Sequence, residues 1–200
     1  KTQPSVSLPT QANNVSTNQA EVVAPENVLI ISKINANAPL VMEPSQQEAN
    51  IQKALQNGVV HYAGTAVPGE IGNVVVVGHS SNDWWEPGNY KFVFALLDKL
   101  TVGDKIQVNY SSKKYVYEVT NTKVVLPTDL SVLNQTSEPT LTLITCTPVG
   151  TNWKRLIVTA KQVEPLPSNQ TKPQLASSED IKTANLPGSA NSFGDHVGGF

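Results

Sequence analysis

The sequence holds three side-chain types that can do covalent chemistry together, and each is rare in this chain. Cys146 is the only cysteine and Arg155 the only arginine, while His79 is one of three histidines, with His61 and His196. A thiol can act as a nucleophile, an imidazole can transfer a proton, and a guanidinium can hold the negative charge of a tetrahedral intermediate. Together they indicate acyl transfer, provided that the three side chains meet in the fold.

The flanking residues suggest how a fold could present these groups. Cys146 closes the apolar run 140–146, His79 follows the β-branched run 73–78, and Arg155 opens another apolar run. A side chain at the exit of a buried strand is held rigidly and can still face a cleft. Taken singly, each residue also has a plainer interpretation: an inert buried thiol, a hydrogen-bonded structural imidazole and a surface cation.

The hydrophobic pattern predicts mostly β-strands. Short apolar runs bounded by Gly, Pro and polar turns are typical of strands, and they occur at 28–34, 73–79, 104–110, 114–120, 121–127, 140–146 and 155–163. One helix is predicted between Ser45, which forms a capping-box pattern with Glu48, and Gly58. Residues 92–100 are predicted to form a short helix or turn. Seven or eight closely spaced strands favour an all-β fold, either a closed barrel or a sandwich.

Composition separates one domain from two polar flanks. Residues 1–25 and 166–200 are rich in polar residues and Pro without sustained periodicity, so we expect a flexible linker and a loosely ordered tail. Residues 26–165 have the size of one domain. A net charge of -2 and a pI of about 5.9 argue against a nucleic-acid partner. The single cysteine excludes an internal disulfide, and no apolar run is long enough to form a membrane-spanning helix.

Three sequence motifs resemble a known family. GEIGNVVVVGHSSN surrounds His79, TLITCTP surrounds Cys146 and KRLIVTA surrounds Arg155, and all three are similar to motifs of the sortases, the cysteine transpeptidases of bacterial cell surfaces. The similarity extends from about residue 28 to about residue 163. The resemblance implies a closed eight-stranded β-barrel in which Cys146 ends one strand, Arg155 starts the next and His79 ends a neighbouring strand.

The resemblance also implies a reaction and its partners. Cys146 would attack a Leu-Pro-x-Thr-Gly-like sorting signal of a surface protein, His79 would protonate the leaving amine, and Arg155 would bind the oxyanion. An amine acceptor, from a peptidoglycan precursor or another protein, would then resolve the thioester. We expect an extracytoplasmic protein at the cell surface, held at a membrane only through an anchor outside the given sequence.

Further residues are weaker candidates for contact with the substrate. Thr145 could assist the oxyanion, and three tryptophans could line the groove: Trp84, Trp85 and Trp153. Each has an equally ordinary structural interpretation, as a strand residue or as a loop anchor. We expect no metal and no other cofactor, because the carboxylates of the loops do not cluster in the sequence.

Three alternatives accompany the transpeptidase prediction. The barrel could bind a peptide at the cell surface without catalysis. An L,D-transpeptidase is disfavoured, because His79 and Cys146 are 67 residues apart, whereas that class places these residue types close together. Residues 186–190, LPGSA, resemble a sorting signal and could occupy the groove as an intramolecular pseudo-substrate, although Leu-Pro recurs elsewhere in this Pro-rich chain.

Overall fold

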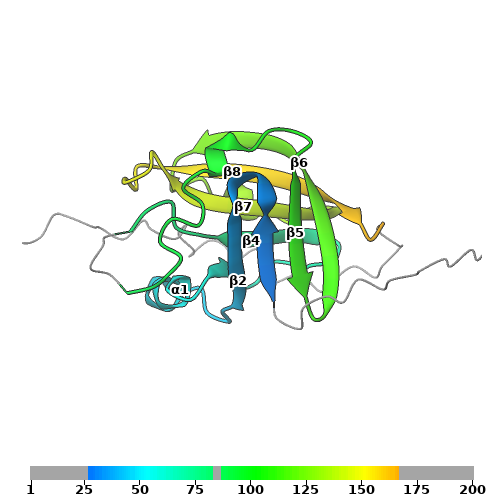
Figure 1. Cartoon of the computed structure of the whole chain (residues 1–200), viewed down its shortest axis with the longest axis horizontal. Helices are drawn as coiled ribbons and strands as arrows, with labels where there is room; N and C mark the ends of the chain where they lie inside the picture. Colours follow the sequence, from blue (N-terminus) through cyan, green and yellow to red (C-terminus); the bar gives the residue numbers. More distant parts are fainter. Residues whose placement is uncertain (1–26, 83–86, 167–200) are drawn as a thin grey trace, which may run out of the picture.

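The computed structural model describes residues 27–82 and 87–166, and these form a closed barrel of eight strands (Figure 1). The predicted all-β, closed eight-stranded barrel is confirmed. Around the barrel the strand order is β1-β2-β3-β4-β7-β8-β6-β5, with β5 pairing back to β1. The strands are β1 (Val28–Ile31), β2 (Ala36–Met42), β3 (Val59–His61), β4 (Gly72–Val77), β5 (Lys105–Tyr110), β6 (Lys113–Val125), β7 (Pro139–Thr147) and β8 (Lys154–Glu164).

Two apolar clusters lie on opposite faces of the barrel wall. One cluster fills the interior of the barrel. On β4, β7 and β8 its members are Val74, Val76, Leu141, Leu143 and Val158. The second cluster lies outside, where α1 (Glu48–Leu55) and η3 (Leu130–Leu133) cover the wall, and it includes Ile51, Leu55, Val75, Val77, Ile144 and Ile157. Strand residues alternate between the two clusters, as the two-residue period of a strand requires. The wall of β4, β7 and β8 is therefore buried on both sides.

The first predicted strand is shorter than the apolar run indicated. The prediction of one strand over 28–34 is wrong, because β1 ends at Ile31 and a 3-10 turn, η1 (Ser32–Ile34), follows it. Asn35 then adopts the left-handed conformation, with a φ of 52°, and the chain reverses into β2. Asn tolerates this conformation better than most residues, which explains the reversal inside an apolar stretch.

The predicted capping box does not form. Helix α1 begins at Glu48 with Gln47 as its N-cap residue, and no side chain caps it. The Ser45 hydroxyl instead accepts a hydrogen bond from the Gln47 N–H at 3.1 Å, a local turn that competes with helix initiation. Gly58, which the pattern predicts as the end of the helix, is also required by packing, because a Cβ there would lie 2.2 Å from the Pro39 carbonyl oxygen.

Three more strand assignments differ from the predictions. Strand β2 was not among the runs predicted from the hydrophobic pattern. The segments 114–120 and 121–127 form one strand, β6, whose register with β8 shifts at two places. The three-residue β3 was not predicted as a strand, because so short a run carries no periodicity. The turn predicted at residues 111–113 is confirmed: Ser111 and Ser112 have φ values of 49° and 59° between β5 and β6.

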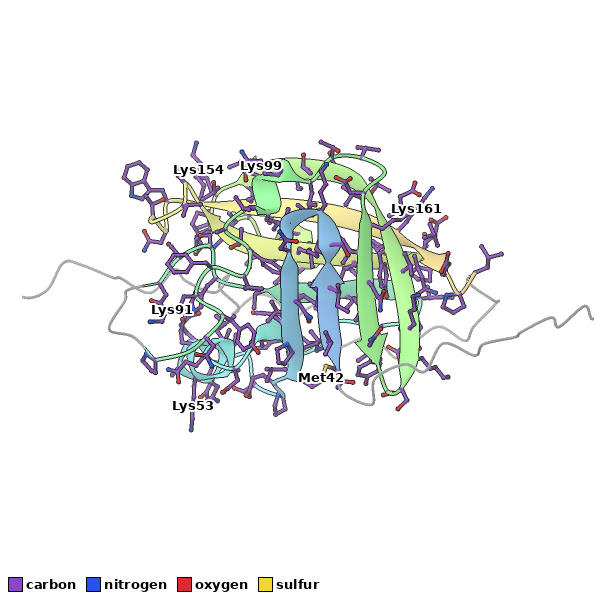
Figure 2. All side chains as sticks on the ribbon, viewed as in Figure 1. Met42, Lys53, Lys91, Lys99, Lys154 and Lys161 are labelled. Carbon is purple, nitrogen blue, oxygen red and sulfur yellow. The ribbon has the colours of Figure 1, made fainter. Side chains whose placement is uncertain are left out.

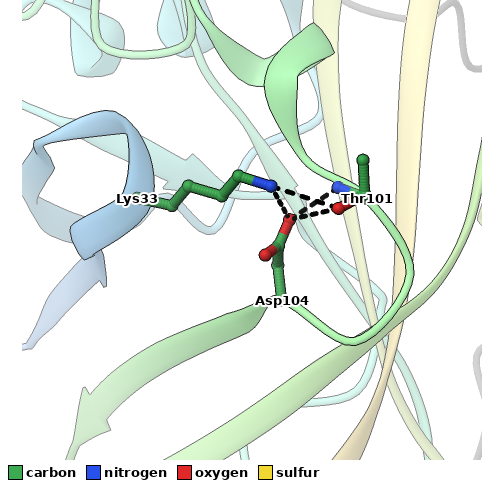
Figure 3. Close-up of polar contacts among 3 residues, drawn as sticks. All are labelled: Lys33, Thr101 and Asp104. Carbon is green, nitrogen blue, oxygen red and sulfur yellow. Dashed lines mark hydrogen bonds and ion pairs between the residues drawn. The ribbon is translucent and has the colours of Figure 1, made fainter.

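A polar contact ties η1 to the turn before β5 (Figure 3). The Lys33 ammonium lies 2.7 Å from the Asp104 carboxylate, which also accepts hydrogen bonds from the Thr101 N–H at 2.6 Å and from its hydroxyl at 3.1 Å. These bonds lower the pKa of Asp104, with the Lys33 hydrogen bond as the largest cause. The contact lies on the β1–β5 side of the barrel and plays no part in the site described next.

Candidate active site

The pairing of β4 with β7 brings His79 beside Cys146. The two strands are parallel, with Val77 opposite Ile144, and the Gly78 N–H continues the ladder by donating to the Ile144 carbonyl at 3.1 Å. His79 and Cys146 each lie two residues beyond this matched pair, at the same end of the two strands. Two segments far apart in the sequence thus bring His79 and Cys146 to the same end of two neighbouring strands.

The pairing of β7 with β8 adds the guanidinium. Cys146 and Arg155 are directly opposite each other in the antiparallel ladder, so their side chains leave the sheet on the same face. Ile144 and Ile157, two residues away on each strand, belong to the outer apolar cluster. The thiol and the guanidinium therefore lie on the outer face of the wall, next to the cluster that α1 covers. Figure 1 shows α1 and the β7–β8 loop at the same end of the molecule.

Arg155 is fully buried, with 0% of its surface exposed. Its Nη1 donates to the carbonyl oxygens of Asn152 at 2.9 Å and Lys154 at 3.1 Å. Its Nε and Nη2 are buried and have no hydrogen-bond partner within the described part of the chain. Buried N–H groups of a charged side chain are normally paired, because leaving them unpaired costs free energy. This cation is thus oriented by one nitrogen and offers two others to an acceptor.

Burial dominates the proton affinities of the other two groups. It raises the pKa of the Cys146 thiol, while Arg155 lowers that pKa and Glu48 raises it. Burial also lowers the pKa of His79, and Glu48 acts in the opposite direction. Both dominant shifts favour a neutral thiol beside a neutral imidazole. The guanidinium partly offsets the cost of forming the thiolate.

The backbone around His79 is held from both sides. The Thr145 hydroxyl donates to the Gly78 carbonyl at 2.7 Å, and the His79 carbonyl accepts from the Phe94 N–H at 2.9 Å. Gly78 packs so closely on Phe94 that a Cβ would lie 2.5 Å from the ring. Thr145 is buried and, as the neighbour of Cys146 in a strand, points to the other face of the sheet. Its observed contact fixes the chain that carries His79.

The remaining predicted residues lie apart from this group or outside the described residues. Trp153 lies in the β7–β8 loop with 71% of its surface exposed. Trp84, Trp85, the 186–190 segment and His196 are outside the described residues. His61 is buried, and its Nε2 lies 2.9 Å from the Ala66 carbonyl oxygen and 3.2 Å from the Thr65 hydroxyl.

Glu48, which the sequence pattern identifies only as part of a helix start, also influences the pKa values of two candidate site residues. Its charge acts on both His79 and Cys146. Its position in the sequence could have indicated this. Glu48 precedes Ile51 by three residues and Leu55 by seven, a spacing that puts it on the buried face of α1.

In residues 27–82 and 87–166, no three His, Cys, Asp or Glu side chains gather as a metal site would require. None of the helices in the same ranges has the length and hydrophobicity to cross a membrane.

Comparison with known proteins identifies the family. The chain matches the family model of the Sortase domain over residues 29–163. It is 32% identical to Sortase D of Bacillus subtilis (strain 168) over 157 residues, which cover 76% of this chain and 71% of that protein. It is 34% identical to Sortase SrtE1 of Streptomyces coelicolor over 148 residues, which cover 66% of this chain but only 40% of that longer protein.

Solved structures agree with the sequence comparison. A Clostridium perfringens Sortase D5 transpeptidase matches with a TM-score of 0.57 and 32% identity, over 70% of this chain and 79% of that one. Streptococcus agalactiae sortase C1, in a complex with MTSET, matches with a TM-score of 0.59 and 31% identity, over 71% of each chain. Sequence and fold point to one family, and the chain belongs to the sortases.

Proposed function

We propose that this sortase is an active cysteine transpeptidase in which Cys146, His79 and Arg155 carry out the chemistry. The observation that carries the proposal is the register of three neighbouring strands, which aligns the ends that bear the imidazole, the thiol and the guanidinium. Family membership supports a transpeptidase that acts at the cell surface.

The first half-reaction forms a thioester. His79 takes the thiol proton of Cys146, and the resulting thiolate attacks the scissile carbonyl carbon. The carbonyl oxygen gains negative charge as the carbon–sulfur bond forms. The unpartnered Nε and Nη2 of Arg155 are suited to donate to that oxygen. When the carbon–nitrogen bond breaks, the His79 imidazolium gives its proton to the leaving amine.

The second half-reaction transfers the acyl group. An amine acceptor attacks the thioester carbonyl and loses its proton to the now neutral His79. The carbon–sulfur bond then breaks and returns the thiolate. We propose a Leu-Pro-x-Thr-Gly-like sorting signal as the acyl donor and a cell-wall or protein amine as the acceptor. In this proposal Thr145 fixes the His79 backbone, and the exposed Trp153 of the β7–β8 loop contacts the bound peptide.

Mass spectrometry tests the proposal against a catalytically silent peptide-binding barrel. The full chain is incubated with a sorting-type peptide and a small primary amine, beside a Cys146→Ala control. We expect a peptide–amine product and a trapped thioester only with the wild-type chain. Binding of the peptide without product would favour the silent barrel, and product from Cys146→Ala would refute the mechanism.

A further inference from the structure

The β7–β8 loop forms a tight turn before the chain reaches Arg155. The Pro148 carbonyl accepts hydrogen bonds from the Thr151 N–H at 3.0 Å and from the Thr151 hydroxyl at 2.8 Å. Gly150 has a φ of 85°, the left-handed conformation found at the third position of a type II turn. The loop therefore has a defined backbone conformation, which its own hydrogen bonds support.

This turn leads directly to one of the carbonyls that orient the guanidinium. Arg155 donates from Nη1 to the Asn152 carbonyl at 2.9 Å, and Asn152 is the residue that follows the turn. The other acceptor, the Lys154 carbonyl, belongs to β8, where Lys154 pairs with Thr147 of β7. The sheet thus places Lys154, whereas the position of Asn152 depends on the turn.

A hydroxyl two residues after His79 holds the turn. The Ser81 Oγ accepts a hydrogen bond from the Gly150 N–H at 2.9 Å, although the two residues are 69 positions apart in the sequence. In Figure 2, Lys91, on the segment after His79, and Lys154, at the start of β8, both lie toward the left end of the molecule. The bond between Ser81 and Gly150 joins these two parts of the chain.

The contacts form one chain from the segment after His79 to the guanidinium. Ser81 holds Gly150, the turn positions Asn152, and the Asn152 carbonyl orients Arg155. Nε and Nη2 of Arg155 are buried and have no hydrogen-bond partner in residues 27–82 and 87–166. Because a guanidinium is planar and rigid, the bonds at Nη1 also set the direction in which these two nitrogens point.

We propose that Ser81 is a positioning residue for Arg155: its hydroxyl holds the β7–β8 turn and so keeps the guanidinium directed at the carbonyl oxygen of the bound peptide. The proposal rests on the function proposed above. In this role Ser81 transfers no proton and acts through the turn and the Asn152 carbonyl. A donor to the oxyanion must be in place before the charge develops, so release of the turn should slow the reaction.

Hydrogen exchange of the guanidinium tests the proposal without turnover. Arg155 is the only arginine of the chain, so its Nε–Hε signal is identified at once in an NMR spectrum. We expect Ser81→Ala to speed the exchange of this hydrogen with water about two- to tenfold, as loss of one ordinary hydrogen bond should. Ser81→Thr, which keeps the hydroxyl, should restore the wild-type rate. An unchanged rate in Ser81→Ala would overturn the proposal.

Ser45→Ala is the matched control. Ser45 is half-buried like Ser81, and its hydroxyl also accepts a backbone N–H, that of Gln47 at 3.1 Å. Its bond lies before α1 and is not connected to the β7–β8 turn, so the exchange rate of Arg155 should stay unchanged. An equal acceleration in Ser45→Ala would show that any small loss of stability exposes the guanidinium, and it would refute the positioning role.

Kinetics with a sorting-type peptide and a small primary amine give a second measurement. Because the oxyanion forms only during the reaction, Ser81→Ala should lower kcat and kcat/KM equally, by about two- to tenfold. In an Arg155→Met background, Ser81→Ala should cause no further loss, since its effect passes through the guanidinium. A rise in KM at constant kcat, or the same fractional loss in the Arg155→Met background, would contradict the proposal.

The two measurements also separate this proposal from the proposed function. Faster exchange of Arg155 in Ser81→Ala, in a protein whose wild type forms no product, would refute the proposed function while the hold of Ser81 on Arg155 stands. Product formation by the wild type, with the same exchange rate and the same kcat in Ser81→Ala, would refute the role of Ser81 and leave the proposed function intact.

Discussion

Replacing Arg155 by Met should make the protein more stable and much less active. The guanidinium is fully buried, and only its Nη1 is hydrogen-bonded within the described residues. A buried ion costs several kcal/mol of desolvation, and the two Nη1 bonds return about 1.5 kcal/mol each. We therefore expect Arg155→Met, with its similar length and no charge, to raise the free energy of unfolding by about 1–3 kcal/mol.

The two bonded carbonyls do not reverse this balance. Asn152 lies in the β7–β8 loop and Lys154 at the start of β8, and both contacts of their carbonyls with Arg155 are only partly buried. Water can therefore replace the lost donors. Activity should respond in the opposite direction, because loss of the oxyanion donors should lower kcat/KM by about a hundredfold or more.

Urea unfolding measures the stability, and hydrolysis of a sorting-type peptide measures the activity. Lys154→Met is the matched control, since it removes a positive charge from the neighbouring exposed position and should change stability by no more than about 0.5 kcal/mol. If Arg155→Met were less stable than both the wild type and this control, the guanidinium would have favourable partners that our reasoning omits, and the argument from its burial would fail.

Three other predictions concern packing, the thiol and a surface contact. Gly78→Ala should lower the free energy of unfolding by about 1–3 kcal/mol and should also lower kcat/KM, because its Cβ meets the buried Phe94 ring. Adding Phe94→Leu should restore part of both losses. No restoration in the double variant would contradict this packing explanation. The rate of Cys146 alkylation by iodoacetamide, measured against pH, should rise with an inflection above the ordinary thiol pKa of about 8.5. In Arg155→Met the inflection should lie at a still higher pH. An inflection below about pH 8.5 in the wild type would instead show a stabilised thiolate. Asp104→Asn should lower stability by about 1 kcal/mol at pH 7, as urea midpoints would show. Folding lowers the pKa of Asp104, so its contribution to stability is fully present above the pKa of the unfolded state and is lost as the pH falls through the pKa of the folded state. A stability difference between wild type and Asp104→Asn that stayed constant down to about pH 2 would contradict this account.

The hydrophobic pattern predicted most of the strands, because they are long enough to show a period, but it left a barrel and a sandwich both open. The closed barrel was predicted from the resemblance to the sortases. The runs at 73–79, 140–146 and 155–163 gave the three central strands to within about two residues. The reversal at Asn35 and the three-residue β3 were not predictable, because the first depends on a single backbone conformation and the second on its neighbours for support.

The candidate site could be predicted only as a list of residues. Rarity and flanking motifs selected Cys146, His79 and Arg155, and only the resemblance to the sortases implied that they lie on neighbouring strands, because no local pattern encodes the parallel pairing of β4 with β7. The burial of Arg155 was likewise unforeseen, because an isolated arginine is typical of a surface.

The parallel alignment of β4 and β7 separates the distance between His79 and Cys146 from the length of chain that connects them. Hydrogen bonds between two adjacent strands set that distance, so the loops around β5 and β6 can gain or lose residues without moving sulfur relative to imidazole. The same barrel can then keep this alignment of strand ends while the loops around β5 and β6, which we call the rim, change to suit different peptides. In an engineering setting, loop exchange at that rim is the natural way to alter which peptide is joined to which amine.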